Sequence, residues 1–176
     1  MRRVAISAVL TVTAIFAVVM LSATSANEGT IKLHASLNGF QESPPKLTSG
    51  TGTFSATISG GVMTYKLTYQ NLSAPAFMAH IHFGQKAVSA GVFIWLCQSA
   101  TAPSPTAGTP TCPAGGGTVT GTANAASVLK IPGQTLNAGN FDDALAIIRS
   151  GEAYVNVHTT NFPPGEIRGQ ISIESD

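Results

Sequence analysis

Alternation of apolar and polar side chains with a period of two is the feature that most constrains the fold of this chain. It is clearest on either side of Gly60 and Gly61, where Thr, Ser and Lys alternate with Phe, Ile, Met, Tyr and Leu over residues 52–58 and 62–69. Successive side chains of a strand point to opposite faces, so this pattern predicts strands with one buried and one exposed face. Because glycine adopts the positive φ angles of a tight turn without steric cost, the Gly pair predicts a β-hairpin.

The same alternation recurs between turn signals along the rest of the chain. Further strands are predicted over residues 31–37, 77–83, 88–97, 117–123, 153–158 and 167–173. Short strands separated by Gly and Pro are typical of all-β folds. We therefore expect an all-β domain, either a two-sheet, Greek-key-like sandwich or a flattened barrel.

One segment departs from the strand pattern. Residues 141–149 carry apolar side chains at helical spacing, with Asn140 before them and Gly151 just after them. Asn is a favoured N-cap, acidic residues are favourable in a first turn, and Gly commonly follows a helix end. The segment therefore predicts one short helix, which includes Arg149.

Composition favours an all-β domain over a helical bundle, and it also excludes nucleic-acid-binding proteins and disordered proteins. Only 10% of the residues are charged, and there are 18 Gly and 10 Pro, whereas helical bundles need Ala, Leu, Glu and Lys in bulk. The formal net charge is +1 and basic residues are scattered, so the clustered Lys and Arg that bind nucleic acid are absent. A hydrophobic content of 44% also excludes intrinsic disorder.

The N-terminus resembles a secretory signal peptide. Arg2 and Arg3 precede an apolar run over residues 4–21 and a small-residue stretch that ends at Ala26. Signal peptidase needs small side chains at its cleavage site, so we expect residues 1–26 to be removed and residues 27–176 to form the domain. The alternative is an uncleaved membrane anchor, because the run nearly reaches the ~20 residues that span a bilayer. The predicted location is secreted or periplasmic, with membrane contact only through an uncleaved segment.

The two cysteines predict a disulfide bond. Cys97 ends an apolar strand, and Cys112 follows across a segment made almost wholly of Ser, Thr, Ala, Pro and Gly. Such a segment has no core of its own and is expected to be a surface loop. In an exported chain, a cysteine pair of this kind is best interpreted as a disulfide. The alternative, two ligands of a metal site, lacks a neighbouring His or Cys.

Three of the four histidines have a spacing that fits a metal site. His80 and His82 flank one residue, so on a strand they share a face, with Cα atoms about 7 Å apart. His158 ends another β segment and completes a three-imidazole set with an open position, which suits Cu or Zn. The alternative is that all three are half-buried strand residues bonded to backbone carbonyls. His34 has no partner spacing and is interpreted as a surface or packing residue.

Three segments resemble the hallmark blocks of the chordin-type domain, abbreviated CHRD, and occur in the same order. They are LNGFQESPP at 37–45, AHIHFG at 79–84 and AYVNVHTTNFPPGEIRGQI at 153–171. The resemblance covers residues 30–173, and its one mild departure is the Phe-Pro-Pro turn at 162–164. It implies an exported single-domain protein of the bacterial type, for which no general activity is established.

The His-x-His triplet and the later Val-His are also similar to the copper-ligand segments of copper/zinc superoxide dismutases. Those enzymes need a bridging His and further ligands between the two segments, whereas residues 83–157 contain no His. The resemblance therefore implies no binuclear site. It assigns no guiding arginine either, because Arg168 is expected to form an ion pair with Glu166, with Glu42 as a further partner.

Two functions from different classes follow from these features. The first is an extracytoplasmic binding or structural module whose partner is a protein or a small ligand. The second is a mononuclear copper or zinc protein, redox-active and superoxide-dismutase-like in its sharpest form, that uses His80, His82 and His158. The chain has no Gly-x-Ser-x-Gly elbow, and disulfide-bonded cysteines offer no nucleophile. The first function ranks higher because the resemblance implies no reaction.

Overall fold

The computed structural model describes residues 29–174, so the predicted signal peptide lies outside the described residues. Within this range, nine strands form one sheet in which every pairing is antiparallel. The strands are β1 (Ile31–Asn38), β2 (Thr51–Ser59), β3 (Val62–Gln70), β4 (Ala76–Phe83), β5 (Gly91–Cys97), β6 (Gly117–Ala123), β7 (Ala153–Thr159), β8 (Ile167–Gln170) and β9 (Ser172–Ile173).

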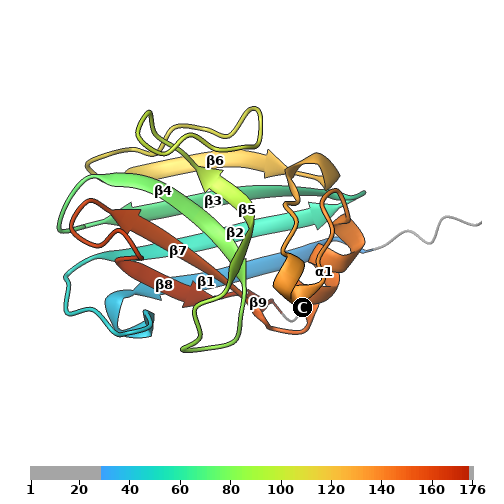
Figure 1. The fold of residues 1–176 in the computed structure, drawn as a ribbon, viewed down its shortest axis with the longest axis horizontal. Coiled ribbons are helices and arrows are strands. Elements are labelled where there is room, and N and C mark those ends of the chain that lie inside the picture. Colours follow the sequence, from blue (N-terminus) through green and yellow to red (C-terminus); the bar gives the residue numbers. More distant parts are fainter. Residues whose placement is uncertain (1–28, 175–176) are drawn as a thin grey trace, which may run out of the picture.

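The sheet curls into a nearly closed barrel of eight strands. Their order is β5-β4-β7-β8-β1-β2-β3-β6, and β9 pairs with β1 outside this path. Figure 1 shows β4, β7 and β8 side by side across one wall. The end strands β5 and β6 come into contact, and Tyr65 on β3 donates a hydrogen bond from its hydroxyl to the Leu96 carbonyl on β5, 2.8 Å away. The fold is therefore the flattened barrel of the two expected architectures.

The hairpin and the helix form where the local sequence predicts them. Gly60 and Gly61 connect β2 to β3 with φ angles of 56° and 74°. The α-helix α1 (Phe141–Arg149) begins after Asn140, whose side chain accepts a hydrogen bond from the Asp143 amide. The other helical segments are the 3-10 turns η1 (Gly39–Gln41), η2 (Ala125–Ser127) and η3 (Pro132–Gln134). No helix among residues 29–174 is long and apolar enough to cross a membrane.

Two strand predictions differ from the structure by more than one residue at an end. The strand predicted over 88–97 begins only at Gly91, because residues 84–90 form a loop in which Ala87 has a φ of 59°. The segment 167–173 divides into β8 and β9, because the chain changes partner. The Ile171 amide still bonds to β7 at Ala153, whereas β9 pairs with β1.

Cys97 and Cys112 form the predicted disulfide, with their Cα atoms 5.0 Å apart. The loop between them is tied to the end of β5 by two backbone hydrogen bonds, from Gln98 to Pro110 and from Cys112 to Gln98. The alternative in which the two cysteines are metal ligands is therefore wrong.

One wall of the barrel is buried on both faces. Strands β2 and β3 alternate buried and exposed residues, whereas β7 is buried at all seven positions. Ala79, Ile81, Val155 and Val157 belong to the hydrophobic core. Because side chains alternate along a strand, their neighbours on β4 and β7 lie on the opposite face. Those neighbours are mostly polar, and three of them bond to the loops that follow β4 and β7: His82, Tyr154 and His158. These loops cover a second, polar layer.

Candidate metal centre

Strands β4 and β7 place His80, His82 and His158, the histidine cluster, on the polar layer of this wall. In the register of the two strands, His158 lies opposite Met78, while Asn156 lies opposite His80. Directly opposed residues of antiparallel strands share a face, so the three rings converge. One ligand nitrogen from each ring lies within 4.8 Å of the others, and the side chains are 3%, 7% and 5% exposed in sequence order.

The structure thus brings together the three histidines selected by spacing and separates the fourth. His34 lies on the partly exposed side of β1, and its Nε2 is 3.2 Å from the Ser36 hydroxyl. This position agrees with the interpretation of His34 as a surface or packing residue.

Two rings of the cluster are held by backbone carbonyls. Nδ1 of His82 lies 2.8 Å from the Ala90 carbonyl oxygen, and Nδ1 of His158 lies 2.7 Å from that of Pro163. A carbonyl oxygen only accepts, so Nδ1 carries the proton in both rings and donates it. In a neutral ring the lone pair is then on Nε2. This is the usual orientation of metal-binding histidines, in which one nitrogen is fixed and the other is free to coordinate.

Both Nε2 atoms face the same side-chain oxygen. Oδ1 of Asn156 lies 2.9 Å from Nε2 of His82 and 3.0 Å from Nε2 of His158. An amide oxygen also only accepts, so a hydrogen bond at either contact requires a second proton on the ring. The rings would then be imidazolium cations inside a buried site. As neutral rings, they present two lone pairs to this amide. Either a cation beside the oxygen, or the NH2 group of the amide rotated by 180°, would stabilise that arrangement.

His80 adds a third imidazole to this group. Its Nδ1 lies 3.2 Å from Nε2 of His158, and its Nε2 is buried without a hydrogen-bond partner. Its ring packs edge-on against Trp95, with ring centroids 4.3 Å apart. With metal–nitrogen bonds of about 2.0–2.1 Å, ligand atoms of a four-coordinate ion lie about 3.3 Å apart in a tetrahedron and about 2.9 Å apart at right angles. The contacts of 2.9, 3.0 and 3.2 Å are close to these values. The three imidazole nitrogens together spread over as much as 4.8 Å, so a bound ion would draw the rings closer to one another.

The protein environment keeps the cluster uncharged. Burial, together with repulsion from the neighbouring rings, lowers the pKa of His80 to about 2. Burial lowers the pKa of His158 to about 4, although its bond to Pro163 acts in the opposite direction. Burial also lowers the pKa of His82, against the effect of its bonds to Ala90 and Asn156. Neutral imidazole is the form that binds a metal ion.

A stack of side chains connects the cluster to the next strand. The Tyr154 ring lies parallel to the His82 ring, with centroids 4.6 Å apart, and the Arg168 guanidinium lies 3.3 Å from the Tyr154 ring centroid. Arg168 donates one hydrogen bond to the Gln85 carbonyl, at 2.8 Å. The stack therefore runs from β4 through β7 to β8.

The predicted ion pair between Arg168 and Glu166 is wrong. Glu166 precedes β8, where strand alternation no longer places it beside Arg168, and its carboxylate accepts hydrogen bonds from Thr48, Ser73 and Thr159. Burial raises the pKa of Glu166, but these bonds outweigh it and hold the pKa below its usual value. The acid that interacts electrostatically with Arg168 is Glu42. Burial raises the pKa of Glu42 to about 7, and the positive charge of Arg168 opposes this rise.

Asn156 and Tyr154 are two residues of the site that histidine spacing does not select. Both lie on β7 at intervals of two residues from His158, so the spacing rule that paired His80 with His82 also places them beside His158. Their side chains are not typical metal ligands, so the sequence of this segment draws attention to its histidine alone.

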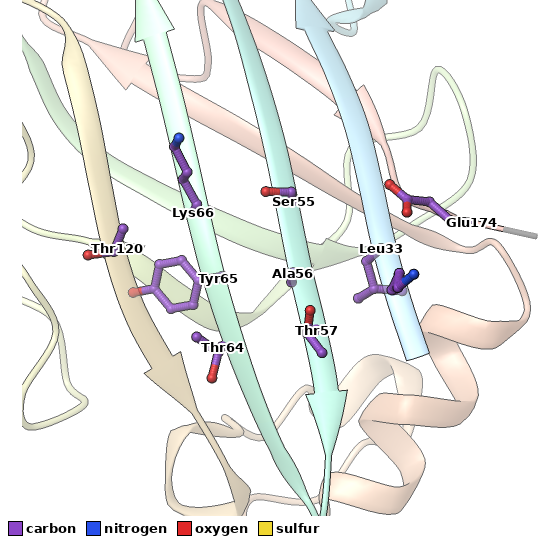
Figure 2. Close-up of a pocket in the computed structure, with 10 residues that line it drawn as sticks. Leu33, Ser55, Ala56, Thr57, Thr64, Tyr65, Lys66, Thr120 and Glu174 are labelled. Atoms are coloured by element: carbon purple, nitrogen blue, oxygen red, sulfur yellow. The ribbon is translucent and has the colours of Figure 1, made fainter. Parts of the chain in front are cut away.

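A separate hollow lies on the outer surface of the barrel. It has a volume of about 320 Å³ and is lined by Ser55, Thr57, Thr64 and Lys66, among others. Figure 2 shows these side chains on the neighbouring strands β2 and β3. None of the residues of the histidine cluster lines this hollow.

Comparison with known proteins places the chain in one family. The model of the CHRD domain matches residues 33–171, which include the histidine cluster, Asn156 and both cysteines. No match was found among curated proteins or among solved structures, so the similarity to superoxide dismutases rests on two short histidine segments alone. The chain therefore belongs to the CHRD domain family.

Proposed function

We propose that this CHRD domain binds one zinc or copper ion on His80, His82 and His158. The observation that carries the proposal is the pair of carbonyl-anchored rings, His82 and His158, whose Nε2 atoms face one oxygen of Asn156 at 2.9 and 3.0 Å. Imidazole nitrogens suit both metals. The burial of all three rings adds to the strength of each metal–ligand interaction by excluding water.

Asn156 is the proposed fourth donor. Metal sites with four protein ligands are typically structural, whereas catalytic sites keep one position open. With the amide oxygen in the fourth position, the ion would stabilise the packing of β4 on β7. This role agrees with the ranking of a structural or binding module above an enzyme. The disulfide between Cys97 and Cys112 supports a location outside the cytoplasm, where such bonds persist.

Calorimetric titration of the untagged, metal-free protein with Zn(II) and Cu(II) tests this function. We expect one ion per chain and binding tighter than micromolar. His82→Ala should abolish tight binding, because it removes an anchored ligand. His34→Ala is the matched control and should leave the stoichiometry unchanged. Binding weaker than micromolar, or binding indifferent to His82→Ala, would mean that the histidines only pack and hydrogen-bond.

A redox-active copper site is the second candidate. The imidazole-rich donor set favours it, because copper prefers nitrogen ligands. The burial of the cluster and the oxygen of Asn156 in the fourth position oppose it. Superoxide consumption by the copper-loaded protein, compared with the same protein carrying zinc, distinguishes the two candidates. Equal rates would exclude the redox function.

A further inference from the structure

We propose that a pocket over Arg168 binds a small organic carboxylate with an apolar body. The pocket has a volume of about 320 Å³ and lies between the loop that follows β1, the loop that follows β4 and the polar face of β8. Cavities of this size hold small molecules. The lining residues that carry the argument are Phe40, Glu42, Pro45, Lys86, Ala87 and Arg168.

Arg168 is the anchor of the proposed site. Its side chain is 2% exposed, and its guanidinium face is stacked on Tyr154. Within residues 29–174 it makes one hydrogen bond, to the Gln85 carbonyl, although a guanidinium has five N–H donors. A buried cation of this kind is usually paired with an acid. The charge of Glu42 acts on Arg168, but no hydrogen bond joins the two side chains within residues 29–174. A carboxylate in the pocket would supply a hydrogen-bonded acid and accept from the N–H groups that Arg168 does not use on Gln85.

The charges around the pocket favour an anion. Lys86 is exposed at the rim and adds a second positive charge. Glu42 is the acid of the lining, and burial raises its pKa to about 7, so it carries only part of a negative charge at neutral pH. Its Oε1 lies 2.5 Å from the position that a Cβ on Gly165 would occupy. The carboxyl group therefore packs against Gly165, which is itself buried.

The rest of the lining suits an apolar body on the ligand. Phe40 is 68% exposed, and Pro45 and Ala87 line the same pocket. The two loops are tied together, because the Ser43 hydroxyl donates to the Ala87 carbonyl at 2.9 Å. A preformed pocket of this kind binds with little loss of conformational entropy. An aromatic carboxylate matches both the cations and the apolar surface.

NMR titration of the ¹⁵N-labelled, metal-free protein with benzoate tests the site without depending on metal binding. We expect saturable shifts in the amides of residues 40–43, 46, 84–90 and 168–170. Benzamide, which has the same shape without the charge, should cause no saturable shift. Lys86→Gln should weaken benzoate binding about threefold, whereas Lys66→Gln, which removes an exposed charge on β3, should leave it unchanged.

Arg168→Gln provides the stronger test. Removing the fork should weaken benzoate binding about tenfold or more. If Arg168→Gln does not fold, the comparison of Lys86→Gln with Lys66→Gln decides the question. Equal binding of benzamide and benzoate, absence of saturation, or equal weakening by the two lysine variants would overturn the proposal.

Discussion

Oδ1 of Asn156 lies 3.0 Å from Nε2 of His158, two residues further along β7. The same oxygen lies 2.9 Å from Nε2 of His82 on the neighbouring strand. One amide oxygen thus faces rings from both strands, and neither ring has a spare proton to donate when it is neutral. Substitution of Asn156 is therefore the test that best distinguishes a metal centre from a group of packed histidines.

Replacement of Asn156 should change zinc affinity according to the oxygen that remains. Asn156→Asp keeps an oxygen donor and adds a negative charge, so affinity should be retained or increased. Asn156→Leu has a similar size and no donor, and should weaken zinc binding about ten- to a hundredfold. Competition titration with a chromophoric chelator measures both effects.

Asn137→Leu, at an exposed position outside the cluster, is the control for Asn156→Leu and should bind zinc as the unmodified protein does. The prediction fails if Asn156→Leu binds zinc with unchanged affinity, or if Asn156→Asp binds more weakly than Asn156→Leu. The latter result would show that the amide acts as a donor to the rings.

Local signals were sufficient for the parts of the fold that form within a few residues. The Gly60–Gly61 hairpin and the helix at 141–149 depend on turn and cap chemistry that the sequence displays directly. The pairing of His80 with His82 is equally local, because it follows from strand alternation.

The remaining features depend on contacts between distant segments. The neighbours of β7 are β4 and β8, and no local pattern specifies that order, so the meeting of His158 with His80 was a hypothesis. Glu42 approaches Arg168 from the loop that follows β1. Neither the hydrophobic period nor the residue propensity of a loop indicates where its side chains lie. The error at Glu166 has the same origin, because its partners Thr48 and Ser73 belong to other loops.

Loss of the disulfide should destabilise the protein. The chain-entropy model gives about 3 kcal/mol for a loop of this size, and the loop between Cys97 and Cys112 buries little core of its own. Replacing both cysteines by serine should therefore lower the free energy of unfolding by about this amount in urea denaturation. Thiol labelling of the native protein should find neither cysteine free. Labelling of both, or unchanged stability of the double variant, would contradict the prediction.

Tyr65→Phe should weaken the closure of the barrel. The Tyr65 hydroxyl donates to the Leu96 carbonyl in a buried setting, so its removal leaves that carbonyl unsatisfied and should cost about 1–3 kcal/mol. Tyr69→Phe is the matched control, because its bond to the Pro113 carbonyl is only partly buried and should cost less. Urea denaturation compares the two variants. An equal or smaller loss for Tyr65→Phe would show that this bond does not contribute to closure.

The metal-free protein should lose stability as the pH falls below about 6.5. The folded-state pKa values of His80 and His158 are about 2 and 4, and that of His82 is also lowered. Below pH 6.5, and above the folded-state pKa values, the unfolded chain therefore binds more protons than the folded protein. The free energy of unfolding decreases there by up to about 1.4 kcal/mol per pH unit for each histidine. Urea denaturation between pH 5 and pH 8, in the presence of a chelator, measures the slope. A flat profile would contradict the burial of neutral rings.

Glu42→Gln should make this acid dependence steeper. The pKa of Glu42 is raised to about 7 in the folded protein, from an ordinary value of 4.5. Between pH 7 and pH 4.5 Glu42 is protonated in the folded protein and ionised in the unfolded chain. Its protonation therefore stabilises the folded protein as the pH falls, and this gain offsets the loss of stability from about one histidine. Gln removes that offset, and the slope should increase by up to about 1.4 kcal/mol per pH unit. Glu152→Gln, on the loop before β7, is the control. Its free energy of unfolding should depend on pH as that of the unmodified protein does. If that of Glu42→Gln does so too, the carboxyl group of Glu42 is ionised in the folded state throughout this range.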